Sequence, residues 1–116
     1  AGNQNLKSGE IEIQGKPIFL QEYKRQLFLG FDNGCIQIFN AYAGFIKTLP
    51  LGFSGFPLIK NHCIYYFKAH QLFQYDLRKS ESEEILELPI AVEQFSINDN
   101  YLIYLSDGNL NRIQMR

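Results

Sequence analysis

Side chains that could bind a metal ion or act as nucleophiles are few and widely spaced in this sequence. The histidines are His62 and His70, and the cysteines are Cys35 and Cys63. A zinc site needs three or four converging ligands; since the histidines fall in turns at opposite ends of predicted strands, we expect no metal site. The cysteines begin different strands at opposite ends of their sheets, whereas a disulfide needs Cα atoms within about 7 Å. We therefore predict that both thiols are buried packing residues.

Acidic and amide side chains cluster in two short segments, Asp32-Asn33-Gly34 and Asp107-Gly108. A calcium site would need about six to eight oxygen ligands from a compact loop, whereas these residues are explained as hairpin turns. The sequence also lacks a Ser-His-Asp arrangement, a phosphate-binding glycine loop and paired carboxylates on one element. The residues favour a protein that is not an enzyme, with no catalytic residue and no cofactor.

Composition narrows the function further. A formal net charge of −1 and a pI near 6.1 remove the electrostatic argument for a nucleic-acid partner. Apolar runs are far shorter than the roughly 20 residues of a membrane-spanning helix, so no membrane span is predicted. Of the 116 residues, which suit one domain, 46% are hydrophobic and 15% aromatic. This aromatic-rich composition favours β-strands.

The elements that position these residues are short strands, and residues 26–49 show their pattern most clearly. Leu27, Leu29 and Phe31 alternate with the residues between them at the period of two expected of a strand. A tight turn follows at 32–34, and a second, looser turn at 40–44 precedes a third strand.

This unit is repeated along the chain. Phe28, Tyr65 and Ile103 recur at spacings of 37 and 38 residues, and Pro50 and Pro89 are 39 residues apart. Repeats of this length with four short strands are typical of β-propeller blades.

The repeats predict an all-β fold. With the strands of a blade named a to d from the centre outward, the chain holds a lone d strand at residues 10–13, two complete blades, and a last a-b-c set. We therefore expect a polar N-terminal arm over residues 1–9 and a partial β-propeller domain over residues 10–116, made of about three antiparallel four-stranded blades.

The stretch LFLGFDNGCIQIFNAYAGFIKTL resembles the quinoprotein-like (PQQ-type, WD40-like) β-propeller repeat. The match is carried by Leu27-Phe28-Leu29-Gly30, Asn33-Gly34, Asn40-Ala41 and Gly44. Residues 101–108 match more weakly, residues 63–76 more weakly still, and the tryptophan that often closes this repeat is absent from the chain. The resemblance implies the propeller fold but no particular activity, since such propellers include dehydrogenases and assembly scaffolds.

Three blades cannot close a ring, because natural propellers have roughly 4–8 blades. The exposed sheet faces and edges would have to be covered. Either the chain is a piece of a longer one, or copies of it assemble. In a head-to-tail homodimer, each copy would lend residues 10–13 to residues 109–115 of its partner and complete a six-bladed ring. A small open β-sandwich or barrel remains as an alternative fold.

One end of the predicted propeller gathers candidate binding residues, because d-a and b-c loops emerge on the same face. Propellers commonly bind ligands on this face, near the central channel. Phe53, between two glycines, could contact a ligand, and the alternative is that it packs over the next blade. The residues predicted on this face are Lys16, Asp32, Asn33, Phe53, Ser54, His70 and Asp107.

These observations favour a non-enzymatic binding or scaffold module whose loops engage a protein or a glycan. The alternative is a fragment or half of a quinoprotein-like propeller enzyme whose active residues lie elsewhere, and a purely structural role also stays open. The expected partner is another protein or a second copy of the chain. A periplasmic or secreted location is favoured because propellers of this repeat type are often exported and the sequence starts without Met, although two unpaired cysteines argue against it.

Overall fold

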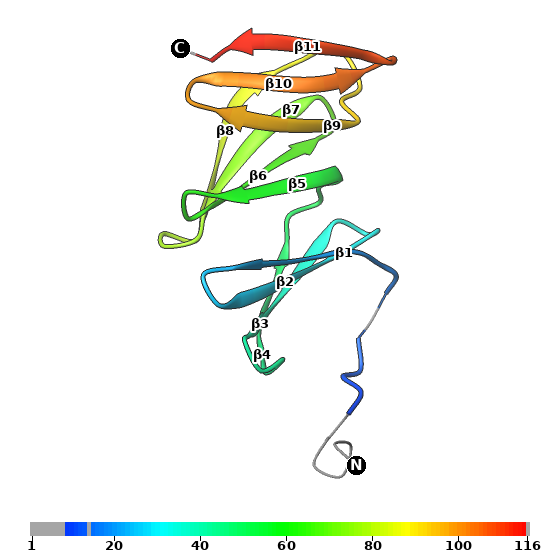
Figure 1. Ribbon diagram of the computed structural model, residues 1–116, viewed down its shortest axis with the longest axis vertical. Helices are drawn as coiled ribbons and strands as arrows, with labels where there is room; N and C mark the ends of the chain where they lie inside the picture. The colour runs from blue at the N-terminus through cyan, green and yellow to red at the C-terminus, as the bar shows by residue number, and fades with distance from the viewer. Residues whose placement is uncertain (1–8, 14, 116) are drawn as a thin grey trace, which may run out of the picture.

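The computed structural model describes residues 9–13 and 15–115, which form eleven β-strands in three antiparallel sheets (Figure 1). The strands of the first sheet are β1 (Pro17–Tyr23), β2 (Gln26–Phe31), β3 (Cys35–Asn40) and β4 (Phe45–Pro50). Those of the second are β5 (Ser54–Lys60), β6 (Cys63–Lys68), β7 (Gln71–Asp76) and β8 (Glu81–Glu87). The third sheet contains β9 (Gln94–Asn98), β10 (Tyr101–Ser106) and β11 (Asn109–Gln114).

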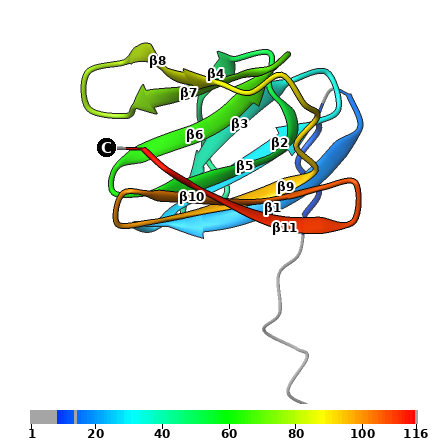
Figure 2. The same cartoon turned by 90° about the horizontal axis from the view of Figure 1, so that it is seen from above.

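Each sheet is a meander in which consecutive strands are neighbours, and the sheets follow one another along the long axis of the molecule. Viewed along that axis, the three sheets lie over one another with their strands fanned (Figure 2). The strands of the first two sheets occupy the a, b, c and d positions of a blade in chain order, and the described residues supply only a, b and c to the third blade. This arrangement confirms the predicted all-β fold of propeller blades and excludes a small sandwich or barrel.

Two-residue turns join the a and b strands of the first two blades in the same way. Lys24 and Arg25 have φ of 53° and 64°, and Asn61 and His62 have φ of 55° and 63°. Two successive positive φ angles are those of a type I′ turn, which matches the right-handed twist of the strands that it joins. The chain therefore repeats its backbone geometry without glycine at these positions.

The core lies between the sheets. One cluster of buried side chains, including Phe28, Ile38 and Ile64, fills the space between the first and second blades. A second cluster, including Leu72 and Leu102, fills the space between the second and third blades. The middle blade is therefore covered on both faces, whereas each outer blade has one face that no other sheet of the described chain covers.

Polar contacts join neighbouring blades at the last residues of two a strands. The His62 N–H donates to the Tyr23 hydroxyl at 2.7 Å, and the Lys60 Nζ donates to the Ile97 carbonyl at 2.6 Å. Tyr23 ends β1 and Lys60 ends β5, so equivalent positions in successive blades both reach the next blade.

The predicted strand at residues 10–13 is not a strand in the structure, and that expectation was wrong. The segment has no neighbouring strand within the described chain to form a hydrogen-bonded ladder, which a β-strand requires. Ile11 and Ile13 nevertheless lie against the open face of the first blade, beside Leu20, Leu27 and Phe39. Of the predicted polar arm, residues 1–8 lie outside the described residues.

Substitution of Gly34 tests how closely the first blade approaches the connection to the second. Gly34 has φ of 86°, and a Cβ there would lie 2.7 Å from the Gly52 Cα, a backbone atom that cannot rotate away. Gly34→Ala should lower the free energy of unfolding by about 2–4 kcal/mol, the cost of a left-handed alanine plus overpacking. Urea denaturation would measure it.

Gly108→Ala is the matched control. Gly108 has φ of 75° in the third blade, but a Cβ there meets nothing within 4 Å. This variant should therefore lose only the conformational term, about 1–2 kcal/mol. Equal losses for the two variants would contradict the close approach at Gly34.

Candidate functional site

The turns between b and c strands and the connections between blades lie at one end of the stack, here called the loop end. The Asp32 N–H donates to the Lys16 carbonyl at 3.0 Å, and the Gly52 N–H donates to the Gly34 carbonyl at 2.8 Å. In the second blade the Leu88 N–H donates to the His70 carbonyl at 2.8 Å. These bonds fasten each b-c turn to the connection beside it, at the end where the sequence placed the candidate residues.

Side chains at the loop end are mostly exposed, and some of them form hydrogen bonds with backbone groups. Asn33 Oδ1 accepts the Cys35 N–H at 3.1 Å, and Ser54 Oγ donates to the Phe67 carbonyl at 3.2 Å. His70 Nδ1 lies 3.2 Å from the Ile90 carbonyl. The exposed candidates are Lys16, Asp32, Asn33, Ser54, His70 and Asp107.

Phe53 differs from the other candidates because it is 6% exposed and belongs to the core between the first two blades. Its ring lies 6.0 Å from that of Phe19, at an interplanar angle of 57°. The structure therefore uses Phe53 to pack the blades together, which was the alternative weighed for it.

Groups able to hold a metal ion do not gather in the described part of the chain, where no three His, Cys, Asp or Glu side chains converge. Cys63 is buried and its Sγ accepts the Gln74 Nε2 at 3.1 Å, whereas Cys35 is half-buried, and both are free thiols. Burial raises the pKa of the neighbouring Tyr65 hydroxyl, and Cys63 adds to this rise. The surroundings of Cys63 and Tyr65 favour a role for both side chains in packing over a role in acid-base chemistry.

A polar hollow on the second blade was not singled out by the sequence. Its lining includes Gln74, Lys79 and Ser82, together with Asp76. The Asp76 carboxylate accepts the N–H groups of Arg78 and Lys79 at 2.8 and 3.1 Å. The bond from Arg78 is the main cause that lowers the pKa of Asp76. This carboxylate organises the turn between β7 and β8.

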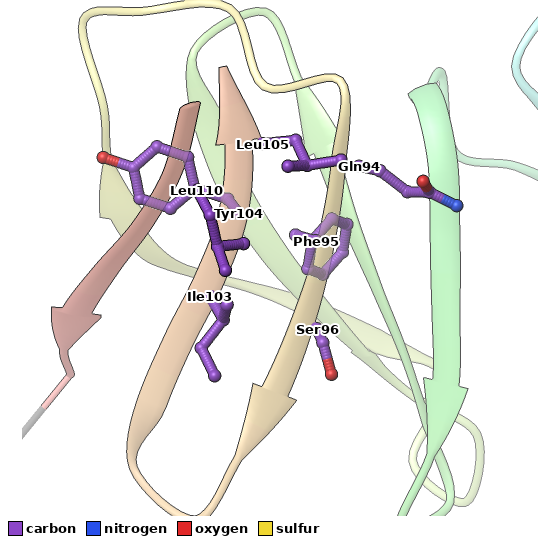
Figure 3. A pocket seen from close by; sticks show the side chains of 7 residues that line it. All are labelled: Gln94, Phe95, Ser96, Ile103, Tyr104, Leu105 and Leu110. Atoms are coloured by element: carbon purple, nitrogen blue, oxygen red, sulfur yellow. The ribbon is translucent and has the colours of Figure 1, made fainter. Parts of the chain in front are cut away.

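The open face of the third blade carries a largely apolar surface. Ile103, Leu105 and Leu110 line a shallow hollow there with Gln94 and Ser96 (Figure 3). Figure 3 also labels Phe95 and Tyr104, which complete the lining. The sequence predicted that both outer blades would expose an apolar face, and the structure identifies the residues.

Leu110 shows that this face resembles the faces that are buried between blades elsewhere in the molecule. Leu110 is 73% exposed, whereas Ile36 and Leu72, at the equivalent place in the other two blades, are 0% exposed. The equivalence follows from register, because Ile36 lies opposite Gly30, Leu72 opposite Phe67, and Leu110 opposite Leu105 on the b strands. The position is buried wherever a following blade is present.

The first blade has a complementary open face. Leu20, Leu27 and Leu29 point away from the second blade, and Leu20 is 65% exposed. Leu27 corresponds to Ile64 and Leu102, which are both fully buried against the preceding blade. The described chain therefore exposes two apolar faces. The face on the first blade is equivalent to those that pack against a preceding blade, and the face on the third blade is equivalent to those that pack against a following blade.

Comparison with known proteins supports the fold and leaves the function open. No family model and no curated protein matches the sequence. BBS1N, solved in complex with ARL6DN, matches with a TM-score of 0.69 and 12% identity over 98% of this chain and 38% of that chain. Hsv2p of Kluyveromyces lactis matches with a TM-score of 0.62 and 11% identity, over 88% of this chain and 34% of that chain.

BamB from Moraxella catarrhalis also matches, with a TM-score of 0.57 and 16% identity, over 91% of this chain and 35% of that chain. These structures are β-propellers, and identities this low show the fold alone. The chain spans about a third of the length of each of them. It is a partial β-propeller of two complete blades and one three-stranded blade. The described residues contain no helix long and apolar enough to cross a membrane.

The lowered pKa of Asp76 predicts how stability depends on pH. A carboxylate with a lowered folded-state pKa stabilises the fold above its unfolded value of about 3.9, and this contribution is lost as pH falls through the folded value. Asp76→Ala should therefore lower the urea midpoint at pH 7, and its difference from the wild type should shrink progressively below about pH 4.

Asp76→Asn is the control, because it retains an oxygen acceptor but cannot titrate. It should keep part of the stability at pH 7 and show a weaker loss in acid than the wild type. An Asp76→Ala difference that stays constant from pH 7 to pH 2 would contradict the role of the ionised carboxylate.

Proposed function

We propose that this chain is a non-enzymatic binding module that joins a protein partner through the open faces of its outer blades. The observation that carries this proposal is the exposure of Leu110 at a position that is fully buried in both other blades. The partner surface that fits such a face is another propeller blade, supplied by another protein or by a second copy of the chain.

The energetic reason is the apolar area left in water. Burial of one leucine side chain contributes about 1.5–3 kcal/mol, and the third-blade face presents Leu105 and Leu110 with Ile103 beside them. Apolar surface of this kind, bordered by polar side chains such as Gln94, is typical of protein interaction sites. The unpaired edge of β11 adds backbone groups that a partner strand could satisfy.

The loop end supplies a second surface within the same proposal. Lys16, Asp32, His70 and Asp107 are exposed there on all three blades. In a completed ring these turns would surround the mouth of the central channel, where propellers commonly hold a ligand. A mixture of one cation, two carboxylates and an imidazole suits recognition of a polar protein or glycan surface more than covalent chemistry.

Association measurements on face variants test the proposal. The mass of the wild-type chain, measured by light scattering, should rise above 13.5 kDa with concentration. Leu105→Glu and Leu110→Glu should each raise the dissociation constant by about tenfold or more, because each loses apolar burial and places a carboxylate in the contact.

Ile90→Glu is the matched control for Leu105→Glu. Both residues are 37% exposed, but Ile90 lies in the connection between β8 and β9, outside both open faces. It should associate as the wild type does. A wild-type chain that stays monomeric at every concentration would exclude a second copy as the partner, and equal association of all variants would overturn the proposed binding surface.

A further inference from the structure

Residues 10–13 carry the sequence pattern of the end of a d strand. In the first blade Leu49 and Leu51, separated by one residue, are both buried in the cluster shared with the second blade. Ile11 and Ile13 have the same spacing. The segment therefore looks like the last part of a d strand that leads into the first blade.

The position of this segment relative to the first blade supports the same interpretation. Glu22 and Ile97 hold equivalent places in their a strands, opposite Leu27 and Leu102 respectively. Leu86 lies on the d strand of the second blade and precedes Ile97 in the sequence. Ile11 precedes Glu22 by the same number of residues. Leu86 packs against the third blade, so Ile11 is placed to do the same for the first blade.

The contacts of the segment agree with this placement. Ile11 and Ile13 lie beside Leu27, Phe39 and Ala43 on the open face of the first blade. A d strand of a preceding blade would occupy this place, since it would cover the outer strands of the blade that follows. Within the part of the chain that the structure describes, no c strand lies beside this segment.

At the other end of the molecule, β11 is a c strand with one edge that no strand of the described residues pairs with. The Met115 N–H donates to the Asn100 carbonyl at 2.6 Å, which continues the β10–β11 ladder. Because bonded and non-bonded residues alternate in an antiparallel ladder, the backbone groups of Leu110, Arg112 and Gln114 face the unpaired edge. In the second blade the residue equivalent to Leu110 pairs with β8.

Charge is also complementary between the two open faces. Among the strand residues that point to the open face of the third blade, the charged side chain is Arg112, which lies over the Tyr101 ring at 5.1 Å. On the open face of the first blade the charged strand residue is Glu22. Opposite charges favour contact between these faces and disfavour contact of either face with its own kind.

We propose that the partner is a second copy of this chain, and that each copy adds residues 10–13 to the free edge of the other's β11, with Ile11 opposite Leu110. This inference rests on the proposed binding function and names its partner. The exchange is reciprocal, as two-fold symmetry requires. Two sets of three blades then make six, a number within the range of closed propellers, roughly 4–8.

The exchange must occur between chains. Residues 10–13 and β11 lie at opposite ends of the molecule, whose longest extent is 54 Å (Figure 1). The three blades of one chain are packed in an open series, so its own β11 cannot reach its own N-terminal segment while both blade–blade cores remain intact.

A disulfide across the proposed strand pair tests this register. With Ile11 opposite Leu110, Glu12 lies opposite Asn109 in a non-hydrogen-bonded pair, where Cβ atoms are closest. The double variant Glu12→Cys with Asn109→Cys, in a Cys35→Ser background, should form a covalent dimer in oxidised glutathione. Non-reducing electrophoresis would show twice the chain mass of 13.5 kDa.

Glu12→Cys with Leu110→Cys is the register control, because adjacent strand residues point to opposite faces. It should form the covalent dimer about tenfold more slowly, since the second thiol lacks the local concentration that pairing provides. Equal mixtures of the two single variants Glu12→Cys and Asn109→Cys should also yield the dimer, which confirms that the bond joins two chains.

Deletion of residues 1–14 gives an independent readout. The shortened chain should lose the dimer seen by light scattering, because β11 loses its partner strand in both copies. An association that is sensitive to Leu105→Glu but survives the deletion, with no disulfide in the double variant, would overturn the strand exchange and leave the proposed binding function intact. A monomer without disulfide would overturn the strand exchange and every form of self-association, and would leave a blade of another protein as the partner of the open faces.

Discussion

Burial of both faces of a β-sheet by neighbouring sheets is the constraint on which this molecule depends. Apolar side chains point to both sides of strands such as β6, so a single sheet by itself would leave apolar surface in water on both faces. Stacking solves this for the middle blade and leaves the outer blades half covered. The same sheet-on-sheet contact occurs twice, between the first and second blades and between the second and third. Hydrogen bonds join the blades at each contact, and the two faces that take no part in either contact stay open.

Positions in successive blades are therefore equivalent in geometry while their surroundings differ. Ile36, Leu72 and Leu110 share one place in the blade, and the first two are buried because another sheet follows them. Lys60 and Tyr23 likewise share a place and both reach the next blade with a polar group. Comparison of equivalent positions in successive blades therefore identifies exposed residues, such as Leu110, whose counterparts lie in the core.

The sequence was sufficient to predict strands, turns and blades, because the period of two and the positive-φ turns are local properties. It could not settle residues 10–13, since the EIEI pattern is that of a strand but a strand also needs a neighbour. Phe53 was ambiguous for a similar reason, because an aromatic residue between glycines can pack or protrude, and only the position of Phe19 decides. Ligand-binding roles at the loop end stay predictions, as turn residues serve structure and recognition alike.

The open-ended stack has a consequence for the dynamics of the chain. Each blade contacts only its neighbours, so loss of an outer blade breaks one core cluster, whereas loss of the middle blade breaks both. Opening should therefore proceed by fraying from either end inward. Backbone amides of β6 and β7 would exchange with deuterated solvent last, and those of β1 and β11 first, which gives a graded profile of protection along a chain of uniform architecture.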